Sequence, residues 1–414
     1  MTPKAGHWRA ARAVEIAAIS LVVATGCSRD KQVAPPRLSG QVWHTDFHGE
    51  PLAVYLTREE RGTSVPLSDE VSSRTDPYSR FYLVVRRIPS GAVLHSIEVG
   101  DVPLEADAKI PDIIGFVGDV MWLWRGEPEA RRLSDLSIIA SPRTLAGREA
   151  GSESDQLPTD RAAYTIAPNP VALIARGRDA RFYVVDAVTS SVKPFDPATL
   201  PPSYVRVEDR FGYLQPPGRA RTFTHPFNVM QQSFLTSDKS YYALLSESER
   251  ASVSRWPSGE DHPSGEVARS LFRGPYRTDD RQRPEVDLAR LAQVGSERLI
   301  QAGFVVRRQF SIWDVPDPSS SLVLAKPQLG ADTPWDVVRL ARDGSVLWRT
   351  STGMAGPTAL VDFGSHIGFV GPVPGPSQPV HQLVQLVWID QRTGAKQALA
   401  IGSGELVPAP AASP

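Results

Sequence analysis

The stretch that most constrains the fold of this chain lies near its C-terminal end, at Asp336–Thr352. Its first apolar run is Val337–Leu340, and its second is Val346–Trp348. Between them stands Asp343-Gly344, and glycine accepts the positive φ that a tight hairpin turn requires. The stretch therefore predicts a strand, a two-residue turn and a returning strand.

Looser copies of this hairpin recur at Phe81–Val99 and Val387–Leu399. One repeat is literal, because Ile114–Gly118 and Ile367–Gly371 both read IGFVG and each precedes a tryptophan-bearing strand. A single hairpin of apolar strands cannot bury both of its faces, whereas four-stranded sheets packed radially can, with few open edges. The pattern predicts a mainly β protein, a β-propeller. Blades of about 40–50 residues leave room for roughly six or seven. The expected blade-packing residues are Trp122, Trp124, Trp348 and Trp388.

Length and composition suit a β protein of one large domain or two ordinary ones. The 414 residues include 37 prolines and 31 glycines, which predict many turns and few long helices. The formal net charge is −1 and no long basic run occurs, so no nucleic-acid partner is expected.

One segment departs from the β pattern, at about residues 244–302. Ser246 and Glu249 have the spacing of a capping box, and Pro284 suits the first turn of a helix. Apolar residues follow at helical spacing, namely Leu288, Leu291, Val294 and Leu299. We expect a helical insertion, with a second short helix running through Ile300 and stopped by Gly303.

The first residues predict a targeting segment. Three cations precede a short apolar core, Ile16–Val23, which ends at Ala24-Thr25-Gly26-Cys27. Small residues before a single cysteine resemble the lipobox of bacterial lipoproteins. The resemblance implies cleavage before Cys27, diacylglycerol on its thiol and, because Ser28 follows, transfer to the outer membrane. The competing interpretation is an ordinary signal peptide with an incidental cysteine. Cys27 is the only cysteine, so an intrachain disulfide is impossible.

These signals divide the chain into four parts. We predict a lipoprotein signal peptide over residues 1–26, and the lipidated cysteine with a polar tether over 27–40. The propeller domain is expected over 41–406, with the helical insertion inside it. An Ala/Pro-rich tail, expected to be disordered, occupies 407–414.

The hairpins also point to a family. Arg339–Trp348 resembles the strand–turn–strand of the quinoprotein-like, or PQQ-like repeat, β-propellers, and Asp390–Ala395 resembles the D-x-x-T-G turn of propeller blades. The resemblance implies an architecture and not an activity, because such blades serve enzymes and binding scaffolds alike. The enzymatic members are quinone-dependent dehydrogenases, many of which carry an adjacent cysteine pair over the cofactor. Cys27 stands alone here, so no cofactor is expected.

The only metal-like spacing is His44-x-Asp46-x-His48. Alternate residues of a strand share one face, so these three side chains could converge on one ion. The competing interpretation is a polar segment with solvated side chains, since Gly49 predicts a turn that would interrupt the alternation. The sequence contains no G-x-S-x-G elbow, Walker loop or dinucleotide fingerprint, and no catalytic residue is predicted.

We therefore expect a membrane-anchored envelope lipoprotein that faces the periplasm, with its propeller as a scaffold for another envelope protein. It resembles in kind the propeller lipoproteins of outer-membrane assembly. The expected binding surface is the polar side of the insertion, which includes Arg281, Arg283, Glu285 and Arg290. The insertion could instead cap the propeller's own core. An envelope enzyme, quinone-dependent or metal-dependent, acting in the propeller channel is the alternative function.

Propellers often complete their last blade with a strand from the other terminus, because an unpaired edge invites aggregation. The early strands expected at Gln41–Trp43 and Pro51–Thr57 are the candidates for pairing beside the C-terminal blade, Leu383–Ile401.

Overall fold

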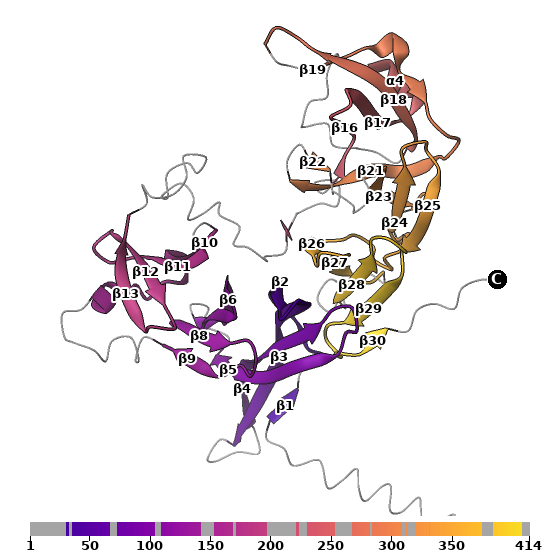
Figure 1. The fold of residues 1–414 in the computed structure, drawn as a ribbon. Coiled ribbons are helices and arrows are strands. Elements are labelled where there is room, and N and C mark those ends of the chain that lie inside the picture. The colour runs from indigo at the N-terminus through magenta and orange to yellow at the C-terminus, as the bar shows by residue number, and fades with distance from the viewer. Residues whose placement is uncertain are drawn as a thin grey trace, which may run out of the picture.

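The computed structural model of this chain shows antiparallel sheets standing side by side along an open arc (Figure 1). Apart from β1, which lies at the outside of the arc, the early strands of the sheets, such as β2, β6, β10 and β26, form its inner side and the later strands lie further out, as in the blades of a β-propeller. The predicted mainly β, propeller-type architecture is confirmed. The residues that the structure describes are 30–32, 35–66, 73–103, 109–141, 153–168, 171–196, 221–222, 230–252, 267–281, 284–308, 311–312, 319–330, 332–374 and 384–407.

Three sheets form the first half of the arc. Sheet I contains β1 (Asp30–Gln32), β2 (Arg37–Phe47), β3 (Glu50–Pro66), β4 (Ser73–Arg87) and β5 (Val93–Pro103). Sheet II contains β6 (Asp112–Val117), β7 (Val120–Trp124), β8 (Pro128–Arg132) and β9 (Ile138–Ala140). Sheet III contains β10 (Tyr164–Pro168), β11 (Val171–Arg176), β12 (Phe182–Asp186) and β13 (Ser191–Phe195), and is preceded by the 3-10 helices η2 (Glu153–Gln156) and η3 (Arg161–Ala163).

The other three sheets form the second half of the arc, in which sheet VI lies next to sheet I and sheet IV lies at the far end (Figure 1). Sheet IV contains β16 (Ser233–Leu235), β17 (Ser240–Leu245), β18 (Ala268–Thr278), β19 (Pro284–Val286) and β20 (Ala292–Gln293), with α4 (Glu247–Ser252) and η6 (Leu288–Arg290). Sheet V contains β15 (Met230–Gln231), β21 (Leu299–Arg308), β22 (Ser311–Ile312), β23 (Ser320–Lys326), β24 (Asp336–Ala341) and β25 (Val346–Ser351), and joins sheet IV where β18 pairs with β21. Sheet VI contains β14 (Arg221–Thr222), β26 (Ala359–Asp362), β27 (His366–Pro372), β28 (Val384–Asp390), β29 (Lys396–Ala400) and β30 (Leu406–Val407).

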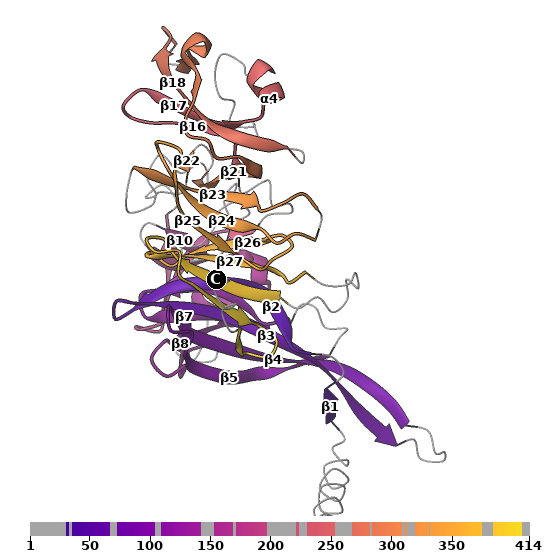
Figure 2. The ribbon, with the colours of Figure 1, turned by 90° about the vertical axis from the view of Figure 1, so that its right-hand side faces the viewer.

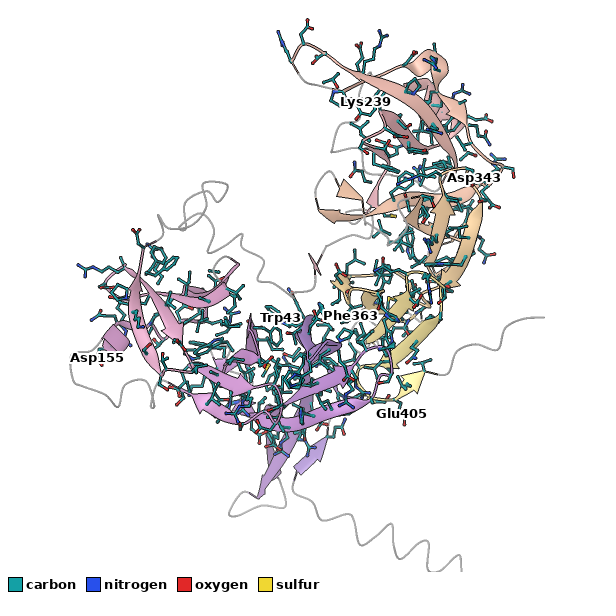
Figure 3. All side chains as sticks on the ribbon, viewed as in Figure 1. Trp43, Asp155, Lys239, Asp343, Phe363 and Glu405 are labelled. Carbon is teal, nitrogen blue, oxygen red and sulfur yellow. The ribbon has the colours of Figure 1, made fainter. Side chains whose placement is uncertain are left out.

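Apolar cores fill the spaces between neighbouring sheets, where the side chains gather in Figure 3. Trp122 and Trp124 lie in the core between sheets II and III, and Trp388 lies between sheets VI and I. Trp348 packs against the core between sheets V and VI. The prediction that these tryptophans pack the blades is confirmed.

The two ends of the chain meet where sheet VI packs face to face on sheet I. Trp388 Nε1 donates a hydrogen bond of 2.9 Å to the Pro89 carbonyl oxygen, and Arg86 Nη2 donates one of 2.7 Å to the Gly404 carbonyl oxygen. Within the described ranges no strand of sheet I pairs with a strand of sheet VI. The predicted strand exchange is therefore wrong, because both early strands pair inside sheet I, one in β2 and one in β3.

The turn at Asp343-Gly344 is wider than the predicted two-residue turn. Ala341 N donates to Ser345 O over 2.9 Å, and Gly344 N donates to Ala341 O over 3.0 Å. Gly344 has the predicted positive φ, 83°. The register between β24 and β25 shifts at Arg339 and Leu340, and this bulge absorbs the extra residue.

A second turn recurs in sheets I, II and VI. In each, the first residue's N–H donates to the sixth residue's carbonyl, and the fifth residue's N–H donates back to the first residue's carbonyl. Among the described residues the turns run over Arg87–Ala92, Arg132–Ser137, Asp390–Ala395 and Ala400–Glu405. The fifth residue has a positive φ each time, in Gly91, Leu136, Gly394 and Gly404. In the Asp390 turn Oδ1 of the aspartate accepts from Thr393 N over 2.7 Å, as a D-x-x-T-G turn requires.

In the described parts of residues 244–302, which are 244–252, 267–281 and 284–302, the predicted helical insertion is not observed. The capping box is present, since Ser246 N donates to Glu249 Oε2 over 2.8 Å and α4 follows it. The helix predicted through Ile300 is wrong, because β21 begins at Leu299. Of the residues whose spacing suggested helices, Leu291 instead packs, together with Val286, on the outer face of β17 and β18. No helix in the described part of the chain is long and apolar enough to span a membrane.

Strands extend into the predicted tether, residues 27–40, and into the first residue of the predicted tail, residues 407–414. β1 and the first residues of β2 fall within the predicted tether, and β30 includes Val407. The predicted signal peptide, Cys27 and residues 408–414 lie outside the described residues.

Candidate binding pocket

A pocket of about 540 Å³ lies where the turns of sheets I, II and III meet. Four connections contribute to it: β2–β3, β6–β7, β8–β9 and β12–β13. The lining residues are Phe47, His48, Asp119, Val120, Arg132, Ser134, Ile139, Ala187 and Val188. Successive sheets present these hairpin turns at the same end. Side chains as far apart in sequence as His48 and Val188 therefore line one pocket.

The wall from sheet I is a tight hairpin turn. His48 and Gly49 have φ values of 53° and 79°, as a two-residue turn with both residues left-handed requires. This turn sets the His48 ring beside that of Phe47, with centroids 4.1 Å apart. Gly49 thus ends the strand alternation, as the sequence suggested.

Sheet II supplies the polar part of the pocket. The two turns involved are tied together, since Leu133 N donates to the Asp119 carbonyl oxygen over 2.9 Å. Arg132 Nη1 lies 3.7 Å from Asp135 Oδ2, and both side chains are about half exposed. Hydrogen bonds from Ser137 lower the pKa of the Asp135 carboxyl, so Arg132 faces a carboxylate at neutral pH.

Sheet III supplies an exposed apolar side chain at the mouth. Asp186 Oδ1 accepts from Val188 N over 2.8 Å and from Thr189 N over 3.1 Å, which orders the β12–β13 turn. Burial raises the pKa of Asp186. These hydrogen bonds lower that pKa by more than burial raises it, so the net shift is downward. The turn presents Val188 with 80% of its surface exposed.

The arrangement suits binding better than nucleophilic catalysis. Ser134, His48 and Asp119 are residue types of a catalytic triad, but among the described residues no hydrogen bond joins any two of these side chains. Phe47, Ile139 and Val188 offer apolar surface, and Arg132 and Asp119 offer opposite charges. The pocket can therefore take an apolar group flanked by polar ones.

Of the three candidate metal ligands, the structure keeps His44 and Asp46 together on β2 and places His48 apart from them. His44 and Asp46 lie on β2 with Nε2 and Oδ1 3.4 Å apart, and the His44 ring packs edge-on against Phe363. His48 stands in the turn and lines the pocket. In the part of the chain that is described, no three His, Cys, Asp or Glu side chains are grouped to hold a metal ion. His48 is thus the only one of the three that reaches the candidate site.

Sequence reasoning missed most of the pocket. Its other residues stand in turns whose spatial meeting depends on the order and packing of the sheets, and no local pattern marks them. The one signal that the sequence analysis used was Gly49, which predicted the turn at His48.

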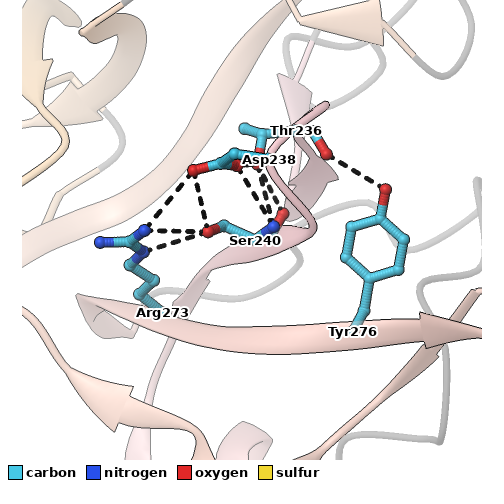
Figure 4. Close-up of polar contacts among 5 residues, drawn as sticks. All are labelled: Thr236, Asp238, Ser240, Arg273 and Tyr276. Carbon is cyan, nitrogen blue, oxygen red and sulfur yellow. Dashed lines mark hydrogen bonds and ion pairs between the residues drawn. The ribbon is translucent and has the colours of Figure 1, made fainter.

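A second polar cluster surrounds the β16–β17 turn of sheet IV (Figure 4). Arg273 Nη2 donates to Ser240 Oγ over 2.9 Å and lies 3.6 Å from Asp238 Oδ2. Tyr276 Oη donates to the Thr236 carbonyl oxygen over 3.1 Å. These bonds fasten the turn to β18, so the cluster is structural.

The polar residues expected to face a partner lie on the outer part of sheet IV and near it. Arg281, Glu285 and Arg290 are exposed, and Arg283 lies outside the described residues.

Comparison with known proteins gives a limited result. No protein-family model and no curated protein matches the sequence. The chain is similar to the β-propeller domain of the Trilobed protease from Pyrococcus furiosus, with 11% identity, a TM-score of 0.27, and coverage of 86% of this chain and 94% of that one. It is also similar to the tricorn protease, with 12% identity, a TM-score of 0.19, and coverage of 86% of this chain and 30% of that one. Likeness at this level says nothing about activity.

Proposed function

We propose that the chain is a lipid-anchored envelope protein whose propeller, of roughly six or seven blades, binds another protein through the pocket between sheets I, II and III. The observation that carries the proposal is the composition of the pocket mouth. Val188 is 80% exposed there, next to Arg132 and above an apolar wall. An exposed apolar side chain rimmed by charges is typical of protein-binding surfaces.

The pocket also has the mechanical character of a recognition site. Its walls are turns held by Asp side chains and by backbone bonds between turns, and those turns stand on buried strands. A preorganised surface loses little conformational entropy on binding. The expected partner contributes an apolar side chain to the pocket and a carboxylate near Arg132.

A photo-crosslinking residue placed at Val188 tests the binding role. We expect one defined adduct in envelopes, lost when Arg132 is also replaced by glutamate. The matched control is the same residue at Leu329, which is 56% exposed in the β23–β24 connection, away from the pocket. Equal adducts at both positions, or an adduct indifferent to Arg132→Glu, would contradict the proposal.

The anchor is tested separately. The apolar segment and Ala24-Thr25-Gly26-Cys27 support lipid attachment at Cys27. Cys27→Ser is expected to abolish incorporation of a fatty-acid probe. Equal labelling of wild type and variant would disprove lipidation at this residue.

A further inference from the structure

Two strands of sheet I extend well beyond their neighbours. β3 has 17 residues and β4 has 15, and they pair as far as Pro66 and Ser73. β2 covers β3 only from Arg58 back toward the hairpin turn, and β5 covers β4 only from Tyr78 onward. Beyond the parts covered by β2 and β5 the two strands continue as an arm, residues 62–66 with 73–77, which leaves the stack of sheets in Figure 2.

The first described strand of the chain lies on this arm. β1 pairs antiparallel with β3, with Asp30 opposite Thr63 and Gln32 opposite Arg61. Traced backward from Asp30, the chain therefore heads toward Pro66, the outer end of the arm. Cys27 is three residues from Asp30, a reach of at most about 10 Å. A lipid on Cys27 is thus confined to the outer end of the arm.

The arm is electrically balanced at its base. Arg58 Nη2 lies 3.0 Å from Glu60 Oε1, and Arg61 Nη2 lies 2.7 Å from Glu59 Oε2. Arg37 also pairs with Glu60. Paired charges neither attract nor repel an anionic bilayer strongly, so the lipid, not electrostatics, decides where the arm sits.

The pocket lies at the other end of the same strand. β3 begins at Glu50, directly after the turn that carries His48, and ends at Pro66 on the arm. Seventeen residues at a strand rise of ~3.3 Å span roughly 50 Å. We propose that the arm stands on the lipid bilayer and holds the binding pocket roughly 50 Å away from it, facing away from the membrane. This orientation rests on the lipidation of Cys27 proposed above.

The test uses the lipidated, mature protein in vesicles that contain lipids with a nitroxide quencher on the headgroup. Because Cys27 is the only native cysteine and carries the lipid, a single introduced cysteine takes the fluorophore alone. We expect Ser73→Cys, at the end of the arm, to lose most of its fluorescence. Val188→Cys, at the pocket, should lose essentially none.

The control addresses the pairing of β1. In an antiparallel strand every second backbone N–H faces the neighbouring strand, so one of the two amides of Lys31 and Gln32 faces β3. The double variant Lys31→Pro with Gln32→Pro therefore removes the hydrogen bond that β1 donates to β3 there, whichever residue makes it. This variant should still float with vesicles but lose the quenching at Ser73. Val33→Pro with Ala34→Pro, just outside β1, should leave the quenching unchanged.

The outcomes separate two failures. Protein that does not float with vesicles disproves the anchor. Protein that floats with equal quenching at Ser73 and Val188, or with more at Val188, overturns the orientation.

Discussion

The fifth residue of the recurring six-residue turn must adopt a left-handed backbone conformation. Gly91, Leu136 and Gly394 all have positive φ values there, and Ser190 (φ 48°) stands at the same place in the β12–β13 turn. Only glycine adopts this conformation without cost. Leu136 is 2% exposed, so its burial offsets the backbone cost.

Two substitutions test this position in opposite directions. Gly394→Ala should lower the free energy of unfolding by about 2–4 kcal/mol, from left-handed strain plus a clash. A Cβ there would lie 2.7 Å from the Trp348 ring. Ser190→Gly should raise the free energy by about 0.5–1 kcal/mol. Urea denaturation measures both, and a stabilising effect of Gly394→Ala would refute the account.

His366 predicts a pH dependence of stability. Burial lowers the pKa of His366, although Asp390, 3.9 Å from its ring, raises it. Below the ordinary pKa of 6.5 the unfolded chain therefore binds the proton before the folded chain does, and stability falls as pH falls. Urea unfolding at pH 7.5 and 5.5 should show a smaller loss for His366→Gln. An equal loss in wild type and His366→Gln would contradict this account.

Asp-Gly and Asp-x-x-Thr-Gly could be recognised in the sequence because their turn chemistry is local. The left-handed Leu136 and Ser190 could not, because neither residue type signals a positive φ. The same distinction holds in the pocket: Gly49 predicted the turn at His48, whereas nothing local marks Val188 or Arg132 as its neighbours.

At the scale of elements, the literal IGFVG repeat is not a structural repeat. Ile114–Gly118 falls on β6, the first strand of sheet II, and Ile367–Gly371 falls on β27, which pairs between β26 and β28. Strands buried on both faces read as apolar runs wherever they stand in a sheet. The pattern therefore predicts a buried strand without giving its position.

The misjudged helices have a related cause. Leu288, Leu291 and Val294 follow helical spacing, yet the chain makes only the single 3-10 turn η6 between two short strands. Tertiary packing decides the outcome, because Val286 and Leu291 cover the outer face of β17 and β18. α4 forms where a local capping box specifies it.

Helix α4 also neutralises a buried cation. Arg269 on β18 is fully buried, and its Nη2 lies 2.6 Å from Glu249 Oε1. Glu249→Gln removes the negative charge that contacts this buried cation, and should cost about 1–3 kcal/mol of unfolding free energy. Glu247→Gln, exposed on the same helix, is the control and should cost under about 0.5 kcal/mol. Equal losses for the two variants would show that Arg269 does not depend on Glu249.

At the scale of the whole molecule, the joint between sheets VI and I joins residues 299 apart in sequence, Pro89 and Trp388. Trp388→Phe removes the indole N–H and leaves the Pro89 carbonyl oxygen without this donor. The matched variant is Trp348→Phe, because Trp348 Nε1 has no hydrogen-bond partner to lose among the described residues. We expect Trp388→Phe to lower the free energy of unfolding by about 1–3 kcal/mol more than Trp348→Phe does, measured by urea unfolding. A larger loss at Trp348 would argue against the joint.

The propeller-type arrangement could be predicted because blades repeat and each repeat carries its own strand and turn signals. The manner in which the ends meet could not. Face-to-face packing of Val42 and Tyr55 against Leu386 and Trp388 uses the same apolar residues that edge-to-edge pairing would use, so the sequence pattern does not distinguish the two.

The joint between the chain's ends also sets an order of events during biosynthesis. The face of sheet I that carries Val42, Ala53 and Tyr55 is covered by residues 359–401, which are synthesised long after it. Until those residues have emerged this apolar face has no native partner, and a partly made chain is exposed to aggregation. The contact joins segments far apart in sequence, so we expect it to form late in folding.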